Sequence, residues 1–239
     1  KLNKIDIPAS VIELGNQCFI GCTGFTTFTV PATVTKLGAE LFSGCTGLTD
    51  IVLNTMTTSL PANMFYGCTG LTAIEIPDYV TSIGTNCFAN SGITSFIIPE
   101  DHKTLTYVDG IVYTKDMTTI VICPPGVSVT EITIPKEVTT ISDGAFKGMT
   151  QLKSIIFEAG GTAPLTIGKS AFSGCTGLTA LAFPDRLTTI GDDAFYGCSN
   201  LMYVELSENL TSMGTYSFYE CTKLLEVYNK SAMSENDIK

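Results

Sequence analysis

The chain has 239 residues, of which 44% are hydrophobic and 15% are charged. This balance predicts an ordered, packed protein, because disordered chains combine few apolar residues with a high charge. A net charge of -10 excludes a nucleic-acid-binding protein of the usual basic kind, and no apolar run reaches the roughly 18–20 residues of a membrane span.

The chain opens on KLNKIDIP, without an initiator Met or a signal peptide. These residues already have the pattern of a short apolar strand, so we expect a mature or trimmed piece of a longer protein. In chain order, the same strand pattern ends at residues 7, 30, 53, 76, 98, 134, 157, 183 and 206, with a frayed copy near Val227. A phenylalanine follows most copies, at Phe19, Phe42, Phe65, Phe88, Phe146, Phe172, Phe195 and Phe218.

These phenylalanines are spaced by 23 residues in most steps, with one step of 26 and one of 58. The 26-residue step contains three extra residues in EAGGTAP, 158–164. Between strand and phenylalanine lies a V-T-x-I-G turn, such as Val80–Gly84. The phenylalanine itself belongs to an A-F-x-G-C segment, such as Ala194–Cys198, which predicts a short helical turn that ends at its glycine.

One such unit cannot bury its own apolar face, whereas stacked units can. The sequence therefore predicts a repeat solenoid of about nine to ten rungs over residues 1–229, followed by a C-terminal tail, 230–239. We expect one continuous parallel β-sheet with short helical turns on the convex side. At a strand spacing of about 4.8 Å, that sheet runs roughly 40 Å along the stack.

The unit I-x-I-P-x-x-V-T-x-I-G-x-x-A-F-x-G-C-T-x-L resembles the BspA-like branch of the leucine-rich repeat superfamily from Leu2 to about Val227. The resemblance implies a β/α superhelix that is secreted or held at a cell surface, mostly in bacteria. It also implies a protein ligand, since some members bind host matrix proteins or other microbes. The oligomeric state does not follow from it.

Two regions depart from the repeat. Residues 100–131 lack the A-F-x-G-C element, and two β-rich runs, Gly110–Tyr113 and Thr119–Ile122, flank the polar turn TKDM. This pattern predicts a β-hairpin insert. The ends are the second departure, because neither shows the polar capping repeat that a solenoid needs for solubility. Either the tail covers the last rung, or the native chain is longer.

The cysteines fall into repeat columns. One column contains Cys22, Cys45, Cys68, Cys175, Cys198 and Cys221, and a second contains Cys18 and Cys87. Met and Ala fill these columns in other rungs, so we expect free, buried thiols. Disulfides between neighbouring rungs remain the alternative, since in-register Cα atoms lie within disulfide range. No spacing typical of zinc ligands is present, so we expect no metal and no cofactor.

The candidate partner-binding face is the concave side of the strands, where variable residues point away from the core. Its candidates are acids and tyrosines: Asp50, Glu75, Tyr203, Glu205, Glu226 and Tyr228. Aromatic side chains beside acids suit a basic protein segment, whereas the simpler interpretation is a solvated sheet face. On the convex side, Tyr196 and Tyr219 are expected to stack. A column of Thr beside the cysteines indicates local turn capping rather than a glycan-binding array.

Enzyme motifs are absent, and the lone His102 lies in the polar stretch PEDHKT, where we expect it to be exposed and solvated. Asp192 and Asp193 are interpreted as charges at a helix start. The sequence thus predicts a non-enzymatic, cell-surface or secreted interaction or adhesion module. The alternatives are a structural spacer or carrier region of a larger surface protein and a glycan-binding module.

Overall fold

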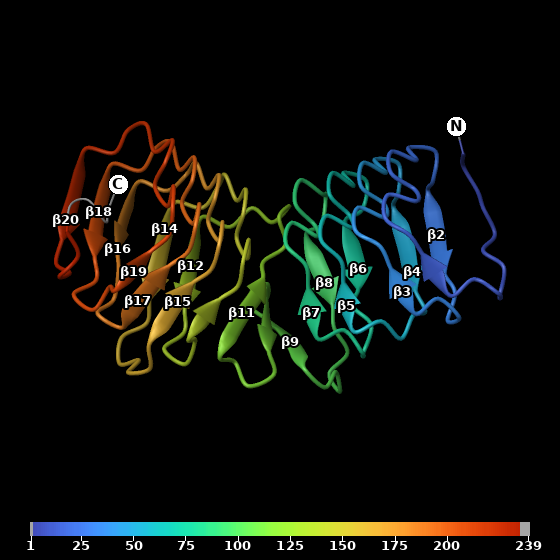
Figure 1. Ribbon diagram of the computed structural model, residues 1–239, viewed down its shortest axis with the longest axis horizontal. Helices are drawn as coiled ribbons and strands as arrows, with labels where there is room; N and C mark the ends of the chain where they lie inside the picture. Colours follow the sequence, from blue (N-terminus) through green and yellow to red (C-terminus); the bar gives the residue numbers. More distant parts are fainter. Residues whose placement is uncertain (1, 235–239) are drawn as a thin grey trace. The chain divides into compact units, whose positions relative to one another are not determined.

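The structure is a computed structural model, and it describes residues 2–234. It divides into two compact units, one formed by residues 1–115 with 123–127 and the other by 116–122 with 128–239. Each unit is a stack of rungs, where one rung is one turn of the chain (Figure 1). The repeat solenoid is confirmed, and the prediction of one solenoid over residues 1–229 stays a prediction.

One set of strands forms what we call the front sheet. Its strands in the first unit are β2 (Thr27–Val30), β4 (Asp50–Leu53), β6 (Ala73–Glu75) and β8 (Ser95–Ile97). Those in the second unit are β12 (Glu131–Ile134), β14 (Ser154–Phe157), β16 (Ala180–Ala182), β18 (Tyr203–Leu206) and β20 (Glu226–Asn229). They pair in parallel, and a residue usually lies beside the residue 23 positions later, as Thr27 lies beside Asp50. Residues 2–7, where the sequence predicts the first copy, form no strand.

A second set of strands forms what we call the back sheet, of which only the run 119–122 was predicted. Its strands in the first unit are β1 (Glu13–Leu14), β3 (Lys36–Leu37), β5 (Ser59–Leu60) and β7 (Ser82–Ile83). Those in the second unit are β11 (Thr119–Ile122), β13 (Thr140–Ile141), β15 (Leu165–Ile167), β17 (Leu187–Ile190) and β19 (Ser212–Met213). Except for β11, they lie in the V-T-x-I-G segments or variants of them, which are extended and pair in parallel because Thr and Ile suit a half-buried strand. The rungs thus contribute strands to two sheets, whereas the sequence predicted a single sheet.

The front sheet is also not continuous within a unit. In the first unit β2 pairs with β4 and β6 with β8, but β4 and β6 are not paired. The backbone N–H of Thr49 donates to Thr26 at 2.8 Å, and that of Thr94 donates to Thr72 at 2.9 Å. Among residues 2–234, the backbone N–H of Thr72 makes no corresponding hydrogen bond to the rung that contains Thr49. The second unit has a comparable break between β14 and β16, around the rung with three extra residues.

The predicted helical turns are wrong, because residues 2–234 contain no helix. The residue two positions before the phenylalanine has a left-handed backbone in rung after rung, with φ of 58° at Glu40, 55° at Asn63 and 53° at Asp193. Left-handed residues interrupt a right-handed helix. Every second backbone N–H of this segment donates to the next rung, as that of Phe42 does to the carbonyl oxygen of Met64 at 2.9 Å. The N–H groups between them close single turns, as Ser43 does to Glu40.

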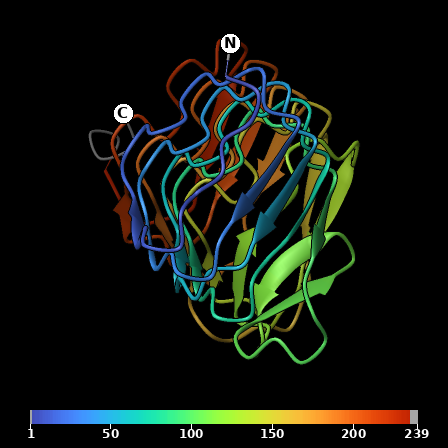
Figure 2. The same ribbon diagram turned by 90° about the vertical axis from the view of Figure 1, so that its right-hand side faces the viewer.

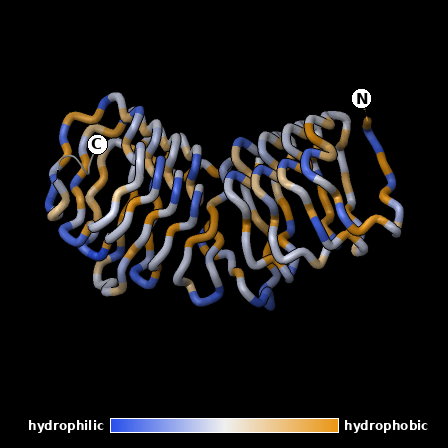
Figure 3. The backbone as a smooth tube through the Cα atoms, in the orientation of Figure 1, coloured by the Kyte–Doolittle hydropathy of each residue, from blue (hydrophilic) through white to orange (hydrophobic). Residues whose placement is uncertain are grey.

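The core of each unit is built from aligned columns. The rings of Phe42 and Phe65 stack at 5.7 Å in the first unit, and those of Phe172 and Phe195 stack at 5.2 Å in the second. Such offset stacks add to the burial of large apolar side chains. Figure 3 shows how hydrophobic and hydrophilic segments alternate along each rung. Repetition therefore serves packing, since each rung that has the A-F-x-G-C segment supplies one ring to the column.

The cysteines are free in the structure, and seven of the nine are buried. Cys18 is exposed and Cys22 is half-buried, contrary to the prediction for these two. Both lie in the first rung of the first unit, where no earlier rung covers them. The column members in later rungs have a role that the sequence did not suggest. Each thiol lies 3.1–3.3 Å from the carbonyl oxygen of the phenylalanine one rung earlier, as Cys45 does to Phe19 and Cys198 to Phe172.

The predicted hairpin insert is present in the first unit. β9 (Leu105–Val108) and β10 (Ile111–Thr114) are antiparallel, with Val108 beside Ile111. The turn between them has positive φ at Asp109 and Gly110, which is the turn that Asp-Gly favours in two-residue hairpins. Figure 2 shows these strands in green. The sequence analysis did not identify β9, and the second predicted run became β11 of the back sheet.

The described part of the tail, residues 230–234, leaves the last rung open. Val227 keeps an exposed fraction of 38%, whereas the matching Val204 is fully buried. The remaining tail residues, 235–239, lie outside the described residues. Within residues 2–234, no helix has the length and apolar character to cross a membrane.

Candidate interaction face

The six candidate residues separate into two groups, one in each unit. Asp50 and Glu75 lie on β4 and β6 in the first unit. The other four lie on β18 and β20 in the second unit, and we call them the Tyr–Glu block: Tyr203, Glu205, Glu226 and Tyr228. All six belong to the side of the front sheet that faces away from the core. Their predicted position on the side away from the core is therefore confirmed, and their role in binding a partner stays a prediction.

Asp50 and Glu75 line a groove of about 300 Å³ between β4 and β6, which we call the acidic groove. Its lining also includes Val52 and Ile97, whose exposed fractions are 42% and 54%. Neither Asp50 nor Glu75 has an ion-pair partner among residues 2–234. The groove thus combines two unneutralised carboxylates with exposed apolar side chains.

The acidic groove lies at the break in the front sheet. β4 and β6 do not pair there. Backbone groups that bond neighbouring strands in other rungs therefore lack such bonds here. Among the described residues, the backbone N–H of Thr72 makes no hydrogen bond to the previous strand. Exposed backbone donors and acceptors along a strand are the groups with which extended peptides pair. The sequence contains no signal for this break, since the rung from Leu53 to Ile76 has the ordinary length.

The Tyr–Glu block is arranged by strand register. Tyr203 lies beside Glu226, and Glu205 lies beside Tyr228, so aromatic and acidic side chains alternate across the two strands. The Tyr203 hydroxyl donates to Oε2 of Glu205 at 3.2 Å. Lys230 forms an ion pair with Oε1 of Glu205, and its ammonium lies 5.9 Å from the centre of the Tyr228 ring. Most of this block is therefore satisfied by internal contacts.

The ionisation of the block follows these contacts. The Lys230 ammonium is the main group that lowers the pKa of Glu205, and the same bond raises the pKa of Lys230. Loss of solvent and the hydrogen bond to Glu205 raise the pKa of Tyr203. At neutral pH, Glu205 is consequently ionised, and the Lys230 ammonium balances its charge. Glu226 has no ion-pair partner among residues 2–234.

The predicted tyrosine stack is confirmed in the second unit. The rings of Tyr196 and Tyr219 lie 5.9 Å apart at an interplanar angle of 27°. Tyr216, which the sequence analysis did not single out, packs edge-on against Tyr219 at 5.2 Å. All three side chains are exposed. Tyr216 was missed because its column is not occupied by tyrosine in the other rungs.

The expectation for His102 is wrong. Its exposed fraction is 1%, and its Nδ1 atom accepts the backbone N–H groups of Thr104 at 3.3 Å and Leu105 at 3.1 Å. Its Nε2 atom lies 3.1 Å from the carbonyl oxygen of Pro77. With Nδ1 as the acceptor, Nε2 carries the proton that bonds Pro77. His102 is thus a structural connector that attaches the start of the insert to the previous rung.

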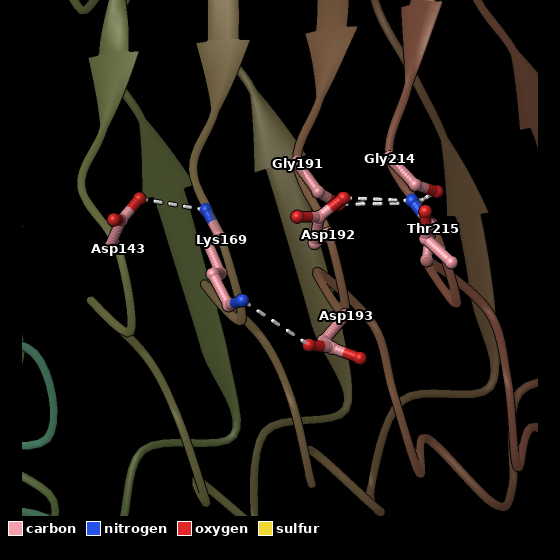
Figure 4. Close-up of polar contacts among 8 residues, drawn as sticks. Asp143, Lys169, Gly191, Asp192, Asp193, Gly214 and Thr215 are labelled. Carbon is pink, nitrogen blue, oxygen red and sulfur yellow. Dashed lines mark hydrogen bonds and ion pairs between the residues drawn. The ribbon is translucent and has the colours of Figure 1, made fainter.

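The interpretation of Asp192 and Asp193 as charges at a helix start is also wrong, since residues 2–234 contain no helix. Oδ1 of Asp192 accepts the backbone N–H of Thr215 at 2.8 Å, in the next rung (Figure 4). Oδ1 of Asp143 accepts the N–H of Lys169 in the same way at 2.8 Å. Asp193 lies 4.0 Å from the Lys169 ammonium. These carboxylates connect consecutive rungs. Within the described residues, no group of three or more His, Cys, Asp or Glu is placed to hold a metal ion.

The hydroxyl contact of Thr222 tests whether the column of Thr beside the cysteines caps local turns. The Thr222 hydroxyl lies 3.5 Å from the carbonyl oxygen of Ser199, which belongs to the previous rung and not to the local turn. Other threonines, at the start of the strands, make the same kind of bond, as Thr49 does to Thr26 at 3.0 Å. Local turn capping by the remaining members stays a prediction.

Comparison with known families settles the repeat type. The sequence profile of the BspA type leucine rich repeat region matches in six copies, over residues 1–108 and 125–237. The chain belongs to the BspA-type leucine-rich repeat family. The unmatched residues of this BspA-type chain, 109–124, contain β10 and β11, which is where the repeat element was missing from the sequence.

Solved structures with the same fold come from several bacteria. A leucine rich cell surface protein from Faecalibacterium prausnitzii is 26% identical with a TM-score of 0.69, over 96% of this chain and 65% of that protein. The pneumococcal vaccine antigen PcpA is 18% identical with a TM-score of 0.72, over 95% and 68%. A leucine-rich repeat protein from Eubacterium ventriosum is 21% identical with a TM-score of 0.65, over 94% and 81%.

The BspA-type chain therefore spans less than two thirds of the length of the Faecalibacterium protein. The likeness to the pneumococcal and Eubacterium proteins supports the fold alone, because their identities are low. No curated protein matches the sequence. Fold alone does not assign a function, which must come from the chemistry of specific surfaces.

Proposed function

We propose that this chain is a non-enzymatic interaction module that acts at a cell surface or after secretion and binds a protein partner. The BspA-type repeat and the cell-surface protein from Faecalibacterium support the location. A repeat array presents one long, variable surface on a regular scaffold, which suits binding better than chemistry. The partner class includes host matrix proteins and surface proteins of other microbes.

The observation that carries the proposal is the acidic groove. Asp50 and Glu75 hold two carboxylates that no lysine or arginine of residues 2–234 neutralises, beside the exposed side chains of Val52 and Ile97. A partner segment with a basic side chain next to an apolar one would meet both features. Oppositely charged surfaces speed association and set the register, and the apolar contacts add to the affinity.

A binding screen of the purified 239-residue chain against matrix proteins and bacterial surface proteins tests the proposal. A true partner should bind at least about tenfold more weakly to the double variant Asp50→Asn, Glu75→Gln, because two charge-assisted contacts are lost. Glu13→Gln is the matched control, since Glu13 is an exposed carboxylate on the back sheet of the same unit. Equal loss in the control and the double variant would contradict the assignment of the groove.

The Tyr–Glu block supports a second binding surface of a different kind. Glu205 is already neutralised by Lys230, so the unpaired Glu226 and the exposed Tyr228 are the groups available to a partner. If Tyr228→Ala loses partner binding while the double variant of the acidic groove binds like the wild-type chain, the binding site is the Tyr–Glu block. Binding of glycans instead of proteins would support the glycan-binding module, and failure of every partner would support a spacer or carrier.

A further inference from the structure

One short side chain interrupts a column of long ones on the surface of the second unit. The column consists of the residues that directly follow the core phenylalanines, and four consecutive rungs supply Lys147, Ser173, Tyr196 and Tyr219. The carbonyl oxygens of Ser173 and Tyr196 accept backbone N–H groups of the previous rung at 2.8 and 2.7 Å, which fixes the register. Ser173 thus lies between a lysine and a tyrosine that are two rung spacings, about 10 Å, apart.

The short side chain leaves a hollow of about 370 Å³, which we call the serine hollow. Its lining consists of Lys147, Ser170, Ser173, Asp193 and Tyr196. Ser170 and Ser173 have exposed fractions of 7% each, so they form the floor, and the other three side chains form the walls. Small-ligand sites are usually concave, with a few polar groups that converge on the ligand.

The polar groups of the serine hollow have spare bonding capacity. Neither serine hydroxyl has a hydrogen-bond partner among residues 2–234, and the Lys147 ammonium has no ion-pair partner there. The Asp193 carboxylate, in contrast, lies 4.0 Å from the Lys169 ammonium (Figure 4). The unbalanced charge of the hollow is therefore positive, although the whole chain has a net charge of -10.

Tyr196 supplies a flat apolar wall. Tyr219 covers one face of its ring at 5.9 Å, and Tyr216 packs edge-on against Tyr219, so neighbouring rings support the position of Tyr196. The opposite face of the Tyr196 ring is the one available to the serine hollow, which this side chain lines. The face of an aromatic ring is the negative part of its quadrupole. It therefore attracts polarised C–H groups, such as those of a sugar ring.

The first unit has no such combination at the same three column positions. Its residues there are Ile20, Ser43 and Tyr66, so an uncharged side chain replaces the lysine. The Tyr66 hydroxyl also accepts Nδ2 of Asn90 at 2.7 Å. Stacking of the rungs alone therefore does not require a free ammonium opposite an aromatic wall, and this arrangement belongs to the second unit.

From these groups we infer that the serine hollow binds an acidic sugar unit of a glycan, that is, a pyranose ring that carries a carboxylate. The sugar carboxylate pairs with the Lys147 ammonium, and the C–H groups of the ring pack on Tyr196. Sugar hydroxyls donate to the Asp193 carboxylate, and the serine hydroxyls, which donate and accept, bond the remaining ones. An acidic side chain of a protein would also pair with Lys147, but it offers Asp193 no hydroxyl donors.

This binding is additional to the proposed function, because the serine hollow lies in the second unit and the acidic groove in the first. Titration calorimetry of the purified chain with methyl glycosides tests it. The methyl glycoside of glucuronic acid or of N-acetylneuraminic acid should bind with a Kd of about 1 mM, and at least about tenfold more tightly than methyl glucoside. Methyl glucoside is the matched probe, since it has the ring of the glucuronide with a hydroxymethyl group in place of the carboxylate.

Lys147→Met should lower the affinity for the acidic sugar to that for methyl glucoside, because only the charged contact is lost. Ser173→Tyr should abolish the binding of both sugars, since a tyrosine ring fills the hollow and the column already contains tyrosine in the next rung. Tyr66→Ala is the control, because Tyr66 is an exposed tyrosine of the same column in the first unit, and it should bind like the wild-type chain.

Melting curves establish that each variant is folded, and should Ser173→Tyr unfold, Lys147→Met decides alone, since a purely structural role of Lys147 would not remove the preference for the charged sugar. Absence of binding by both acidic sugars at about 20 mM would overturn the inference. So would equal binding of the amide of N-acetylglutamate, which has a carboxylate and no sugar ring. Partner binding at the acidic groove is measured with other variants, so failure here leaves the proposed function intact.

Discussion

The thiol sulfur of Cys198 lies 3.3 Å from the carbonyl oxygen of Phe172, one rung before it. The same contact recurs between Cys68 and Phe42 at 3.1 Å in the first unit. The column of cysteines is therefore a column of weak donors that also fill the core, and its members need no redox or metal chemistry to explain them.

The thiols should react in two classes. Burial raises the pKa of Cys45 to about 11 and that of Cys68 to about 12, so both stay protonated and unreactive at about pH 8. Cys18 and Cys22 should react with a thiol reagent in the native protein before any other cysteine. Mass spectrometry of the labelled chain locates the modified residues. All nine thiols should react after denaturation without reductant, and recovery of only one would establish disulfides instead.

The two glycines of residues 42–49, FSGCTGLT, should differ in their response to substitution by alanine. Gly44 has φ of 72°, and a Cβ atom there would make only ordinary contacts, the nearest 3.7 Å away, so Gly44→Ala should cost about 1–2 kcal/mol through backbone strain alone. Gly47 lacks that strain, but its Cβ atom would lie 2.4 Å from the carbonyl oxygen of Thr23, so Gly47→Ala should cost more. Gly15→Ala is the control, because its Cβ atom would have no close neighbour. Urea unfolding of the three variants measures the order, and an equal cost at all three positions would refute it.

His102 should be replaceable by asparagine but not by alanine. His102→Ala leaves the backbone N–H groups of Thr104 and Leu105 without their acceptor, which should lower the free energy of unfolding by about 2–4 kcal/mol. The asparagine oxygen occupies a position close to Nδ1 and accepts from a following backbone N–H, as in Asx turns. His102→Asn should therefore recover at least half of the loss in urea unfolding. Equal losses would show that packing, not acceptance, is the role of the ring.

The ion pair between Glu205 and Lys230 should make stability depend on pH. Lys230 lowers the pKa of Glu205 in the folded state. The pair therefore stabilises the fold fully at pH values above the ordinary glutamate pKa of about 4.3. That contribution disappears as the pH falls through the lower, folded-state pKa. Lys230→Met should therefore lower the melting temperature at about pH 7 and match the wild-type chain at about pH 2. Lys223→Met serves as the comparison, since Lys223 bonds the neutral Asn200 at 2.8 Å and should show no such convergence.

The sequence predicted the repeat solenoid because its main signal is local and repeated. The spacing of the phenylalanines and the alternation within each strand follow from one side chain per rung in each column. The insert was located for the same reason, since a missing element is visible against a regular period. The stacking of Tyr196 on Tyr219 also followed directly from the 23-residue spacing.

The errors concern backbone conformation and contacts between rungs. A-F-x-G-C has the composition of a helical turn, and the left-handed residue two positions before the phenylalanine, such as Asn63, prevents one. The polar surroundings of His102 suggested exposure, whereas its partner Pro77 becomes a neighbour only after the rungs stack. The break between β4 and β6 has no counterpart in the sequence, so the acidic groove became visible only in the structure.

The carboxylate of Asp192 bonds Thr215, and that of Asp143 bonds Lys169, so these polar links run from one rung to the next and no farther. A whole rung added or removed away from Arg186 would carry its own link and leave these links unchanged, whereas Arg186 bonds the carbonyl oxygens of Val138 and Pro135 two rungs earlier and fixes the number of rungs between them. Away from Arg186, gene segments that encode one repeat can thus be gained or lost with little harm to folding. Such an array can change the reach and composition of its outer surface quickly during evolution, while its interior chemistry stays the same.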